Sequence, residues 1–427
     1  MLKSDWKPSR RWFTKNQRFR VINVMNDLSR IAALLAERRQ GYCLPQGLYN
    51  GAEAFAFDQV AIFGTSWLMA GFECELPKPG SYVSQMFGKW PVLIVRGRDG
   101  QIRAFHNSCR HRGSMICPPG SGSSPKLVCP YHRWTYELDG SLFAAMRMGD
   151  DFEKDEHGLH PVRIELVAGA MFICFADNPP PFEDFAAKLE TYLAPSNLKD
   201  GKLAFQSTIS ENANWKLVME NGRECYHCAT GHPELARTFP VGMSKHFDVA
   251  DDARAQAFLD EMQASGLATD AIEGSWWQLA RFSLNRDVVS LSMDGQHVVK
   301  KLMTDLNGGY VGSMRLAVDP HCFVHAVADH TFMFSAMPMG PCETHVTGKW
   351  IVHKDAVEGV DYTIESLSDL WTRTNLQDKD LAENNQLGVN SPGYTPGPYS
   401  PDAEMLALRF TDWYVETARN YVETHGN

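Results

Sequence analysis

The chain has 427 residues, 44% of them hydrophobic and 22% charged, and a net charge of −10. This composition is typical of a globular protein with about two or three domains, and the negative charge disfavours a nucleic-acid partner. No secretory signal and no apolar run long enough to cross a membrane are visible, so the ten cysteines indicate thiols or metal ligands of a cytoplasmic protein rather than a disulfide framework.

The N-terminal segment differs from the rest in charge. Residues 1–24 hold seven basic residues against one acid, hence +6. We expect a poorly ordered extension, or an upstream extension with the natural start at Met25; a basic arm for an acidic partner is the alternative. Residues 28–40 predict a helix that ends at Gly41. The predicted first segment, a basic extension and a helix, is therefore 1–41.

The next segment, 42–177, is predicted to be largely β. Residues 55–71 indicate a helix that turns into a strand. Between 80 and 175, short β-like runs alternate with Gly, Pro and Ser turns, which favours an antiparallel domain; the runs are 91–97, 101–107, 126–131 and 170–176. Residues 178–185 contain three consecutive prolines and are predicted to be a linker.

The last segment, 178–427, mixes strands and helices. Its most unusual stretch, ENGRECYHCATGHPEL at 220–235, is predicted to lie on a helix. A long amphipathic helix is predicted at 402–423. Strands are predicted at 202–212 and around 311–318, 330–338 and 345–353.

Four residues in the β segment have the spacing of a metal centre. They are Cys109-x-His111 and, seventeen residues later, Cys129-x-x-His132. A Rieske 2Fe–2S cluster needs two thiolates on one iron and two imidazoles on the other. The rival is a Cys₂His₂ zinc site, but the first half is unusual for zinc fingers and the second lacks their histidine spacing. The pattern therefore favours the cluster.

A second metal motif lies in the opening part of the last segment: Glu224, His227 and His232 form E-x₂-H-x₄-H. Five residues correspond to about 140° around an ideal helix, so a regular helix would not bring both histidines to one metal. Gly231 can interrupt the helix, and Pro233 disfavours the helical conformation of the residue before it. Two histidines and a remote carboxylate form the triad that binds non-haem Fe(II).

These motifs have other interpretations. Cys225-x-x-Cys228 is the pattern of a redox or zinc pair, but no second such pair accompanies it. Histidines on a helix surface are the ordinary alternative, which the nearby cluster motif disfavours. An electron-transfer protein with an appended domain is a further hypothesis; the second metal motif and the long segment after the cluster motif argue against it.

Taken together, the motifs resemble the oxygenase α subunits of Rieske non-haem iron oxygenases, from about residue 42 to the C-terminus. The nearer resemblance is to the branch that acts on quaternary ammonium compounds, the glycine betaine monooxygenases and the proline betaine (stachydrine) demethylases. The stretches that carry it are 214–228, 231–235, 349–362, 374–391 and 396–400.

The resemblance implies an α+β fold: an N-terminal antiparallel β Rieske domain, and a helix-grip (START-like) catalytic domain with an antiparallel sheet and a long C-terminal helix. It also implies a homotrimer. His227, His232 and Asp378 would be the iron ligands, with Asp380 as the competing carboxylate, and Asn221 would lie next to the ligands.

The resemblance gives Glu224 a separate role. It would bridge the iron ligand His227 and the cluster ligand His132 of a neighbouring subunit. Many family members have Asp at this position, so the longer side chain is a departure from the common pattern. The alternative is an ordinary acid on a helix surface.

The implied reaction is the oxidative N-demethylation of a betaine with release of formaldehyde. It needs the Rieske 2Fe–2S cluster, mononuclear Fe(II) and O₂. The chain has no G-x-G-x-x-G after a strand, so a separate NAD(P)H-dependent flavin/iron–sulfur reductase is expected to supply electrons. The alternatives are an aromatic-ring hydroxylating dioxygenase and a carnitine-type monooxygenase.

A quaternary ammonium is recognised through aromatic faces. Six aromatic residues of the last segment are therefore possible cage residues, although most aromatic residues belong to cores. They are Trp276, Trp277, Phe323, Phe332, Phe334 and Tyr394.

Overall fold

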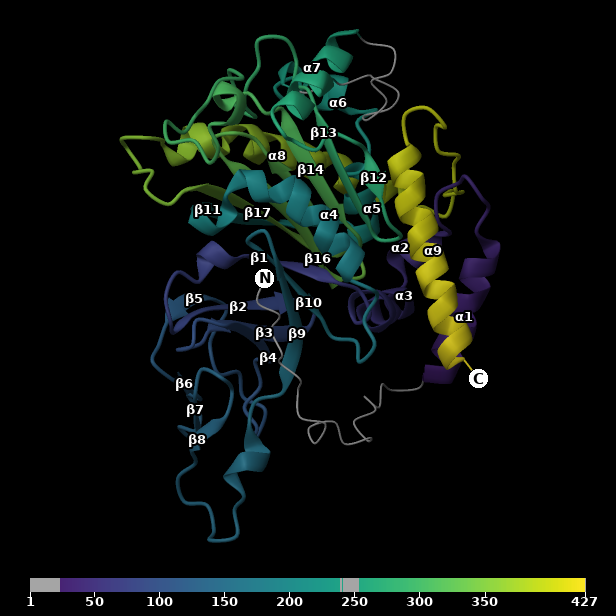
Figure 1. The fold of residues 1–427 in the computed structure, drawn as a ribbon. Coiled ribbons are helices and arrows are strands. Elements are labelled where there is room, and N and C mark those ends of the chain that lie inside the picture. The colour runs from purple at the N-terminus through teal and green to yellow at the C-terminus, as the bar shows by residue number, and fades with distance from the viewer. Residues whose placement is uncertain (1–23, 239, 241–252, 427) are drawn as a thin grey trace.

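The computed structural model describes residues 24–238, 240 and 253–426 (Figure 1). The prediction for residues 1–23 lies outside this range. The helix predicted at 28–40 is confirmed as α1 (Val24–Glu37), which begins four residues earlier and ends three residues earlier than predicted. The predicted helix-to-strand transition is confirmed by α2 (Gln46–Asn50), α3 (Ala52–Asp58), a π-helical turn η1 (Gln59–Phe63) and strand β1 (Leu68–Phe72).

The predicted antiparallel β domain is confirmed. A seven-stranded antiparallel sheet has the order β1-β10-β9-β4-β3-β2-β5, and a small sheet has the order β6-β7-β8. The strands are β2 (Ser81–Phe87), β3 (Trp90–Arg96), β4 (Ile102–His106), β5 (Gly120–Ser123), β6 (Leu127–Val128), β7 (Thr135–Tyr136), β8 (Leu142–Ala144), β9 (Pro161–Val167) and β10 (Ala170–Cys174).

A second seven-stranded antiparallel sheet, in the order β11-β17-β16-β15-β14-β13-β12, forms the other half of the molecule (Figure 1). Its predicted strands are confirmed within a few residues at their ends. The strands are β11 (Gly201–Glu211), β12 (Ile272–Glu273), β13 (Trp277–Phe282), β14 (Ser313–Val318), β15 (Cys322–Ala326), β16 (Thr331–Gly340) and β17 (Glu343–His353).

Helices cover both faces of this sheet. Helix α4 packs on one face; α5 and α8 pack on the other, and α9 runs beside α1 (Figure 1). The helices are α4 (Glu183–Leu193), α5 (Trp215–Asn221), α6 (Cys228–Gly231), α7 (Ala253–Ala264), α8 (Ile364–Val389) and α9 (Met405–His425). Short 3₁₀ turns lie at η2 (Glu73–Glu75), η3 (Lys154–His157), η4 (Ala194–Ser196), η5 (Leu198–Asp200), η6 (Leu235–Arg237) and η7 (Leu306–Gly309).

Two predictions for this half are corrected. The linker predicted at 178–185 ends early, because α4 begins at Glu183: the three prolines precede the helix, and apolar side chains such as Phe185 bury one face of it. The helix predicted over 220–235 is interrupted, because α5 ends at Asn221 and the chain turns before α6.

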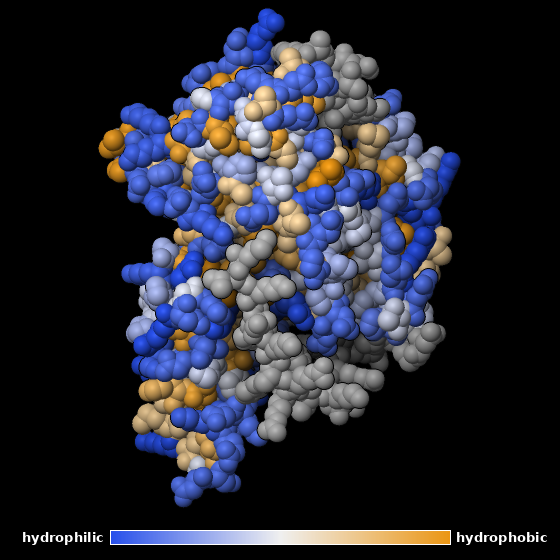
Figure 2. Space-filling model, viewed as in Figure 1, coloured by the Kyte–Doolittle hydropathy of each residue, from blue (hydrophilic) through white to orange (hydrophobic). Residues whose placement is uncertain are grey.

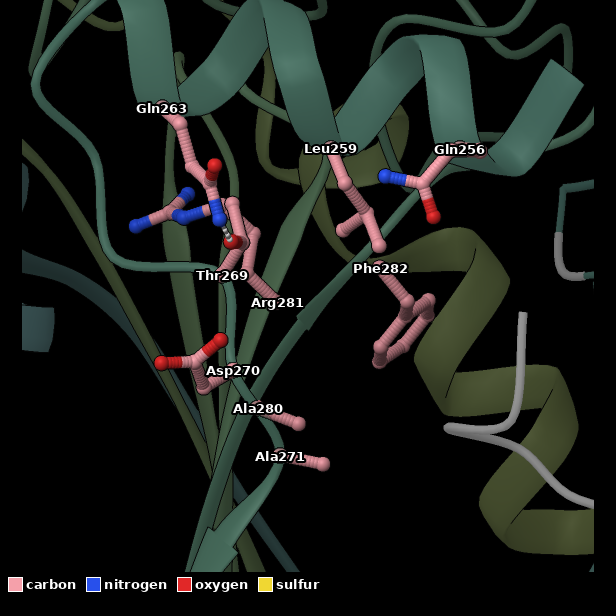
Figure 3. A pocket seen from close by; sticks show the side chains of 9 residues that line it. All are labelled: Gln256, Leu259, Gln263, Thr269, Asp270, Ala271, Ala280, Arg281 and Phe282. Carbon is pink, nitrogen blue, oxygen red and sulfur yellow. Dashed lines mark hydrogen bonds between the residues drawn. The ribbon is translucent and has the colours of Figure 1, made fainter. Parts of the chain in front are cut away.

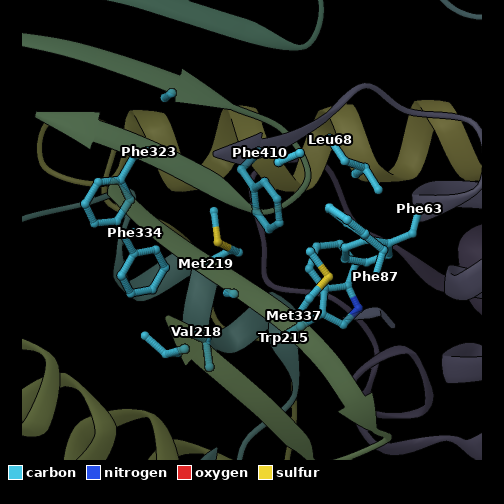
Figure 4. Close-up of a cluster of buried hydrophobic side chains, with 14 of the residues drawn as sticks. Phe63, Leu68, Phe87, Trp215, Val218, Met219, Phe323, Phe334, Met337 and Phe410 are labelled. Atoms are coloured by element: carbon cyan, nitrogen blue, oxygen red, sulfur yellow. The ribbon is translucent and has the colours of Figure 1, made fainter. Parts of the chain in front are cut away.

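The N-terminal helices share a core with the second sheet. Figure 4 shows Phe63 and Phe87 from the first part of the chain beside Trp215, Met219 and Phe410. Trp215 and Phe63 meet edge to face, with ring centres 5.0 Å apart. The segment that precedes β1 is thus held against the half of the molecule that contains the second sheet. The predicted domain boundaries at 41/42 and 177/178 stay predictions.

A buried polar network strengthens the same junction. The Asp58 carboxylate, at the end of α3, accepts hydrogen bonds from Trp215 Nε1 (2.9 Å) and Tyr414 Oη (2.8 Å) and pairs with Lys216. Asp58 and Lys216 are both fully buried. Removing one partner from such a pair leaves a buried charge without compensation, which typically costs about 3–5 kcal/mol.

The surface is largely hydrophilic on the face in Figure 2, with apolar residues gathered near the β6–β8 end. Tyr131 and Phe143 in this region are 57% and 50% exposed. No helix in the described part of the chain is long and apolar enough to cross a membrane.

Candidate metal centres

The loops that carry Cys109 and Cys129 have the same backbone pattern. The amide of Gly113 donates to the carbonyl of Cys109 (2.9 Å), and the amide of Arg133 donates to the carbonyl of Cys129 (3.1 Å). Gly113 and Arg133 both have positive φ angles, 77° and 61°. The left-handed backbone conformation is unfavourable for arginine, so the surroundings of the second loop must hold Arg133 in this shape.

These loops bring the four predicted cluster ligands together. The Nδ1 atoms of His111 and His132 lie 3.2 Å apart, and both rings are partly exposed. The thiols of Cys109 and Cys129 are buried, with 3% and 1% exposure. The ring of His111 stacks on Trp134 at 4.8 Å. Two inner thiols and two outer imidazoles are the ligand set of a Rieske cluster.

Tyr136, on β7, is a further part of this centre. Its hydroxyl lies 3.2 Å from Cys109 Sγ and accepts a hydrogen bond from the amide of Arg110 (3.0 Å). Burial raises the pKa of Tyr136, so the phenol keeps its proton and can donate to the sulfur. Hydrogen bonds to cluster sulfurs tune the reduction potential. Sequence reasoning missed Tyr136, because only the fold of β7 brings it to the first loop.

The second metal motif folds around the short helix α6. His227 immediately precedes α6 and His232 immediately follows it, with non-helical angles of −132° and 72°. This conformation follows from Pro233, which disfavours the helical region for the residue before it. The two Nε2 atoms consequently lie 3.0 Å apart.

Asp378 completes this group from the middle of α8. Its Oδ1 lies 2.8 Å from Nε2 of His232 and 3.3 Å from Nε2 of His227. Asp380, the competing carboxylate, is exposed on the same helix. The three convergent atoms, two imidazole nitrogens and a carboxylate oxygen, fit a 2-His-1-carboxylate iron site.

The electrostatics of this group favour a cation. Burial lowers the pKa of His227, but its hydrogen bonds to the carboxylates of Asp378 and Glu224 outweigh it and raise this pKa to about 9. Burial raises the pKa of Asp378, and its contacts with the two histidines more than reverse this, so the carboxylate stays ionised. A metal ion takes the place of such a proton, since ligands bind it in their deprotonated forms.

Each histidine has a different partner on its other nitrogen. Glu224 Oε1 lies 2.5 Å from His227 Nδ1, and Glu224 Oε2 accepts from the amide of Tyr226. Gln377 Oε1 lies 2.9 Å from His232 Nδ1. Sequence reasoning missed Gln377, although it directly precedes Asp378. Asn221 ends α5, and its side chain makes no hydrogen bond within the described part of the chain.

Cys225 and Cys228 are joined by a disulfide, with Cα atoms 4.8 Å apart. Cys228 Sγ also lies 4.0 Å from His227 Nε2. The other eight cysteines are free, so the bond is a local link in this turn rather than part of a framework.

The fold separates the six possible cage aromatics into two groups. Trp276 and Trp277 pack against Phe185 of α4, with ring centres 4.6 and 5.5 Å away, on the face of the sheet opposite the metal ligands. Tyr394 packs on Tyr49 and donates to the carbonyl of Leu44. Trp276 and Trp277 are buried in the core on that face, and Tyr394 is a partly buried residue that packs against the other core cluster.

The other three lie on the face that α8 covers. Phe323 stacks on Phe334 (4.5 Å), as Figure 4 illustrates. Phe332 stacks on Trp371 of α8 at 4.4 Å, and His325 stacks on the same indole at 5.2 Å. Trp371 lies seven residues, about two turns, before Asp378. This aromatic group therefore lies between the sheet and the helix that carries the carboxylate.

A cleft of about 270 Å³ opens between α7 and β13 (Figure 3). Its inner wall includes Phe282, whose ring lies 6.0 Å from His325 of the aromatic group. None of the metal-centre residues lines it. The lining residues are Gln256, Leu259, Gln263, Thr269, Asp270, Ala271, Ala280, Arg281 and Phe282.

Comparisons with known proteins agree with this geometry. Residues 66–151 match the family model of the Rieske (2Fe-2S) domain, and residues 198–419 match that of the ring hydroxylating alpha subunit (catalytic domain). The chain is 46% identical to a glycine betaine monooxygenase oxygenase subunit of Pseudomonas aeruginosa, over 91% of this chain and 92% of that one. It is 43% identical to the subunit of the same name from Chromohalobacter salexigens, over 90% of this chain and 88% of that one.

A solved structure is also similar. The quaternary ammonium Rieske monooxygenase CntA in complex with L-carnitine aligns with a TM-score of 0.66 and 23% identity, over 90% of this chain and 98% of that one. This similarity confirms the predicted α+β fold. The matches also set aside the zinc-site and electron-transfer hypotheses, because they imply a Rieske cluster beside a catalytic domain with mononuclear iron. The chain therefore belongs to the oxygenase α subunits of the Rieske non-haem iron oxygenases.

Proposed function

We propose that this enzyme oxidatively removes an N-methyl group from a betaine, either glycine betaine or proline betaine, and releases formaldehyde. The observation that carries the proposal is the 46% identity, over 91% of the chain, to a glycine betaine monooxygenase oxygenase subunit. Electrons would come from a separate NAD(P)H-dependent flavin/iron–sulfur reductase. A cytoplasmic location remains a prediction from the cysteine content.

The proposed ligands follow from the two groups of convergent atoms. Cys109 and Cys129 would hold one iron of the cluster, and His111 and His132 the other. His227, His232 and Asp378 would hold the mononuclear iron, which supplies O₂ activation for attack on a C–H bond when it is bound.

The aromatic group beside α8 suits a quaternary ammonium. Such a cation has no proton to donate, and each desolvated aromatic face contributes up to about 2 kcal/mol of attraction. Phe323, Phe332 and Trp371 pack together in one buried region. Arg315 lies on the same face, with its guanidinium carbon 6.0 Å from the centre of the Phe323 ring. Its positive charge suits the carboxylate end of a betaine.

A homotrimer would connect the two centres. In one chain the cluster loops lie at the β6–β8 end and α6 lies at the opposite end (Figure 1). Both proposed sites reach the surface: Tyr131 beside His132 is 57% exposed, and Tyr226 beside His227 is 69% exposed. Glu224 would then join His227 to His132 of a neighbouring subunit.

The purified enzyme is expected to contain three iron atoms and two inorganic sulfides per chain. Two irons belong to the proposed cluster and one to the proposed triad, as the two ligand sets require. Iron and sulfide analysis, with EPR of the reduced protein, measures this. Zinc at the cysteine–histidine loops without a reducible signal would contradict the assignment.

Incubation with a suitable reductase, NADH and O₂ is expected to convert a betaine into its mono-demethylated product, with one formaldehyde per product. The tertiary amine product is expected to be a poor substrate, because it can carry a proton that needs a hydrogen-bond partner. Glycine betaine, proline betaine, carnitine and aromatic acids form the comparison set. Hydroxylation of aromatic acids without formaldehyde from any betaine would favour the ring-hydroxylating alternative instead.

A further inference from the structure

Two side chains form a hydrogen-bonded chain behind one proposed iron ligand, His232. Glu234 Oε2 accepts from Gln377 Nε2 at 3.1 Å, and Gln377 Oε1 lies 2.9 Å from His232 Nδ1. His232 is 1% exposed, so its contacts replace water. Glu234 follows His232 by two residues, whereas Gln377 reaches it from α8, beside Asp378.

The direction of each hydrogen bond follows from the acid at its end. An ionised carboxylate only accepts, so Glu234 must face the NH₂ group of Gln377. This turns the amide oxygen toward His232, and because that oxygen also only accepts, Nδ1 of His232 must carry the proton. In the neutral ring, which is the form that binds a metal, the lone pair is then on Nε2, the atom that lies 2.8 Å from Asp378.

We infer that Gln377, held by Glu234, is a positioning residue that fixes the tautomer and ring orientation of His232 for iron binding. The inference rests on the ligand assignment proposed above, but it does not depend on which substrate the enzyme takes. Partners of this kind behind a ligand typically change metal affinity or activity about 10–100-fold when they are removed.

The two histidines are supported differently. His227 has the carboxylate of Glu224 on Nδ1, whereas His232 has a neutral amide. A carboxylate partner adds negative charge and raises the basicity of a ligating imidazole, while an amide fixes orientation with less change in charge. Gln377 therefore positions His232 without placing a further carboxylate directly against the ligands.

The test is the iron affinity of the mononuclear site. Gln377→Met removes both hydrogen bonds at similar volume, and we expect the dissociation constant for Fe(II), measured by chelator competition, to rise about 10–100-fold. The ferrous–nitrosyl EPR signal should lose intensity in parallel. The visible spectrum of the cluster should stay as in the wild type, because the β6–β8 end that carries the cluster loops lies away from α8 in the same chain (Figure 1).

Gln386 offers a matched control on the same helix. Its side chain also makes two hydrogen bonds, with the amide of Asn214 (2.8 Å) and with Asn390 (2.9 Å), and none with a histidine of the described residues. Gln386→Met is therefore expected to lower the melting temperature while the Fe(II) dissociation constant stays near that of the wild type.

A swapped pair gives the second test. Glu234→Gln combined with Gln377→Glu keeps a donor–acceptor pair between the two side chains and an acceptor for Nδ1 of His232. This variant should bind Fe(II) about tenfold more tightly than Gln377→Met, within the range typical of such partners. The inference is overturned if Gln377→Met binds Fe(II) as the wild type does, if Gln386→Met weakens it equally, or if the swap restores nothing.

Discussion

Glu224→Gln is expected to leave both metal centres loaded while turnover falls by at least about 100-fold, the upper end for a residue behind a metal ligand. The amide has the same shape and can still accept from His227 Nδ1, which the carboxylate now contacts at 2.5 Å. What it loses is the negative charge proposed to couple His227 to a cluster histidine of a neighbouring subunit. Iron content should therefore change little.

Stopped-flow kinetics separates coupling from ligand loss. In the variant, the cluster should be reduced at the wild-type rate and reoxidised slowly when substrate and O₂ are added. The reduction rate serves as the internal control, because it does not involve the bridge. Reoxidation at the wild-type rate would mean that Glu224 is not the bridge.

Asp378→Asn is expected to remove the mononuclear iron and to lower turnover by more than the roughly 100-fold typical of residues that only support a ligand. Its Oδ1 lies within 3.3 Å of both Nε2 atoms, so it supplies the only negative charge among the three convergent atoms. An amide keeps the shape but binds Fe(II) weakly. The cluster should remain, which colour and EPR measure.

Asp380→Asn is the matched control for that substitution. Asp380 lies two residues further along α8 and is exposed, so its loss should leave iron content and turnover near wild-type values. The two variants together decide between the carboxylates that the sequence left open. Loss of iron from Asp380→Asn alone would reverse the assignment.

Both metal motifs could be predicted because their ligands are close in sequence. Cys109 with His111, and Cys129 with His132, lie on single tight loops, so spacing alone reveals the ligand set. The break at Pro233 is equally local, because a proline restricts the residue directly before it. Local steric rules therefore anticipated that His232 would return to His227.

Helix α8 could not be predicted in the same way. Its central stretch, which carries Asp378, is rich in polar and charged residues and lacks a clear apolar repeat. The helix is stabilised by packing against a sheet whose strands lie far away in the sequence, as Trp371 on Phe332 illustrates. Asp378 was therefore predicted as an iron ligand only from the family resemblance, and the contact of Gln377 with His232 was not predicted.

The aromatic residues that line the substrate pocket could not be chosen from the sequence for a related reason. Trp277 and Phe323 both lie on strands of one sheet, yet they face opposite sides of it. Only the register of the strands and the placement of α4 and α8 decide which side faces the metal ligands. A list of aromatic residues in the sequence cannot contain that information.

A single turnover without reductase tests the central claim most directly. The oxygenase is reduced chemically, freed of reductant and mixed with O₂ and glycine betaine or proline betaine. We predict that the cluster is reoxidised and that formaldehyde and the demethylated amine form in equal amounts, up to about one per mononuclear iron. Cluster reoxidation without formaldehyde from either betaine, in protein that carries both metal centres, would contradict the account.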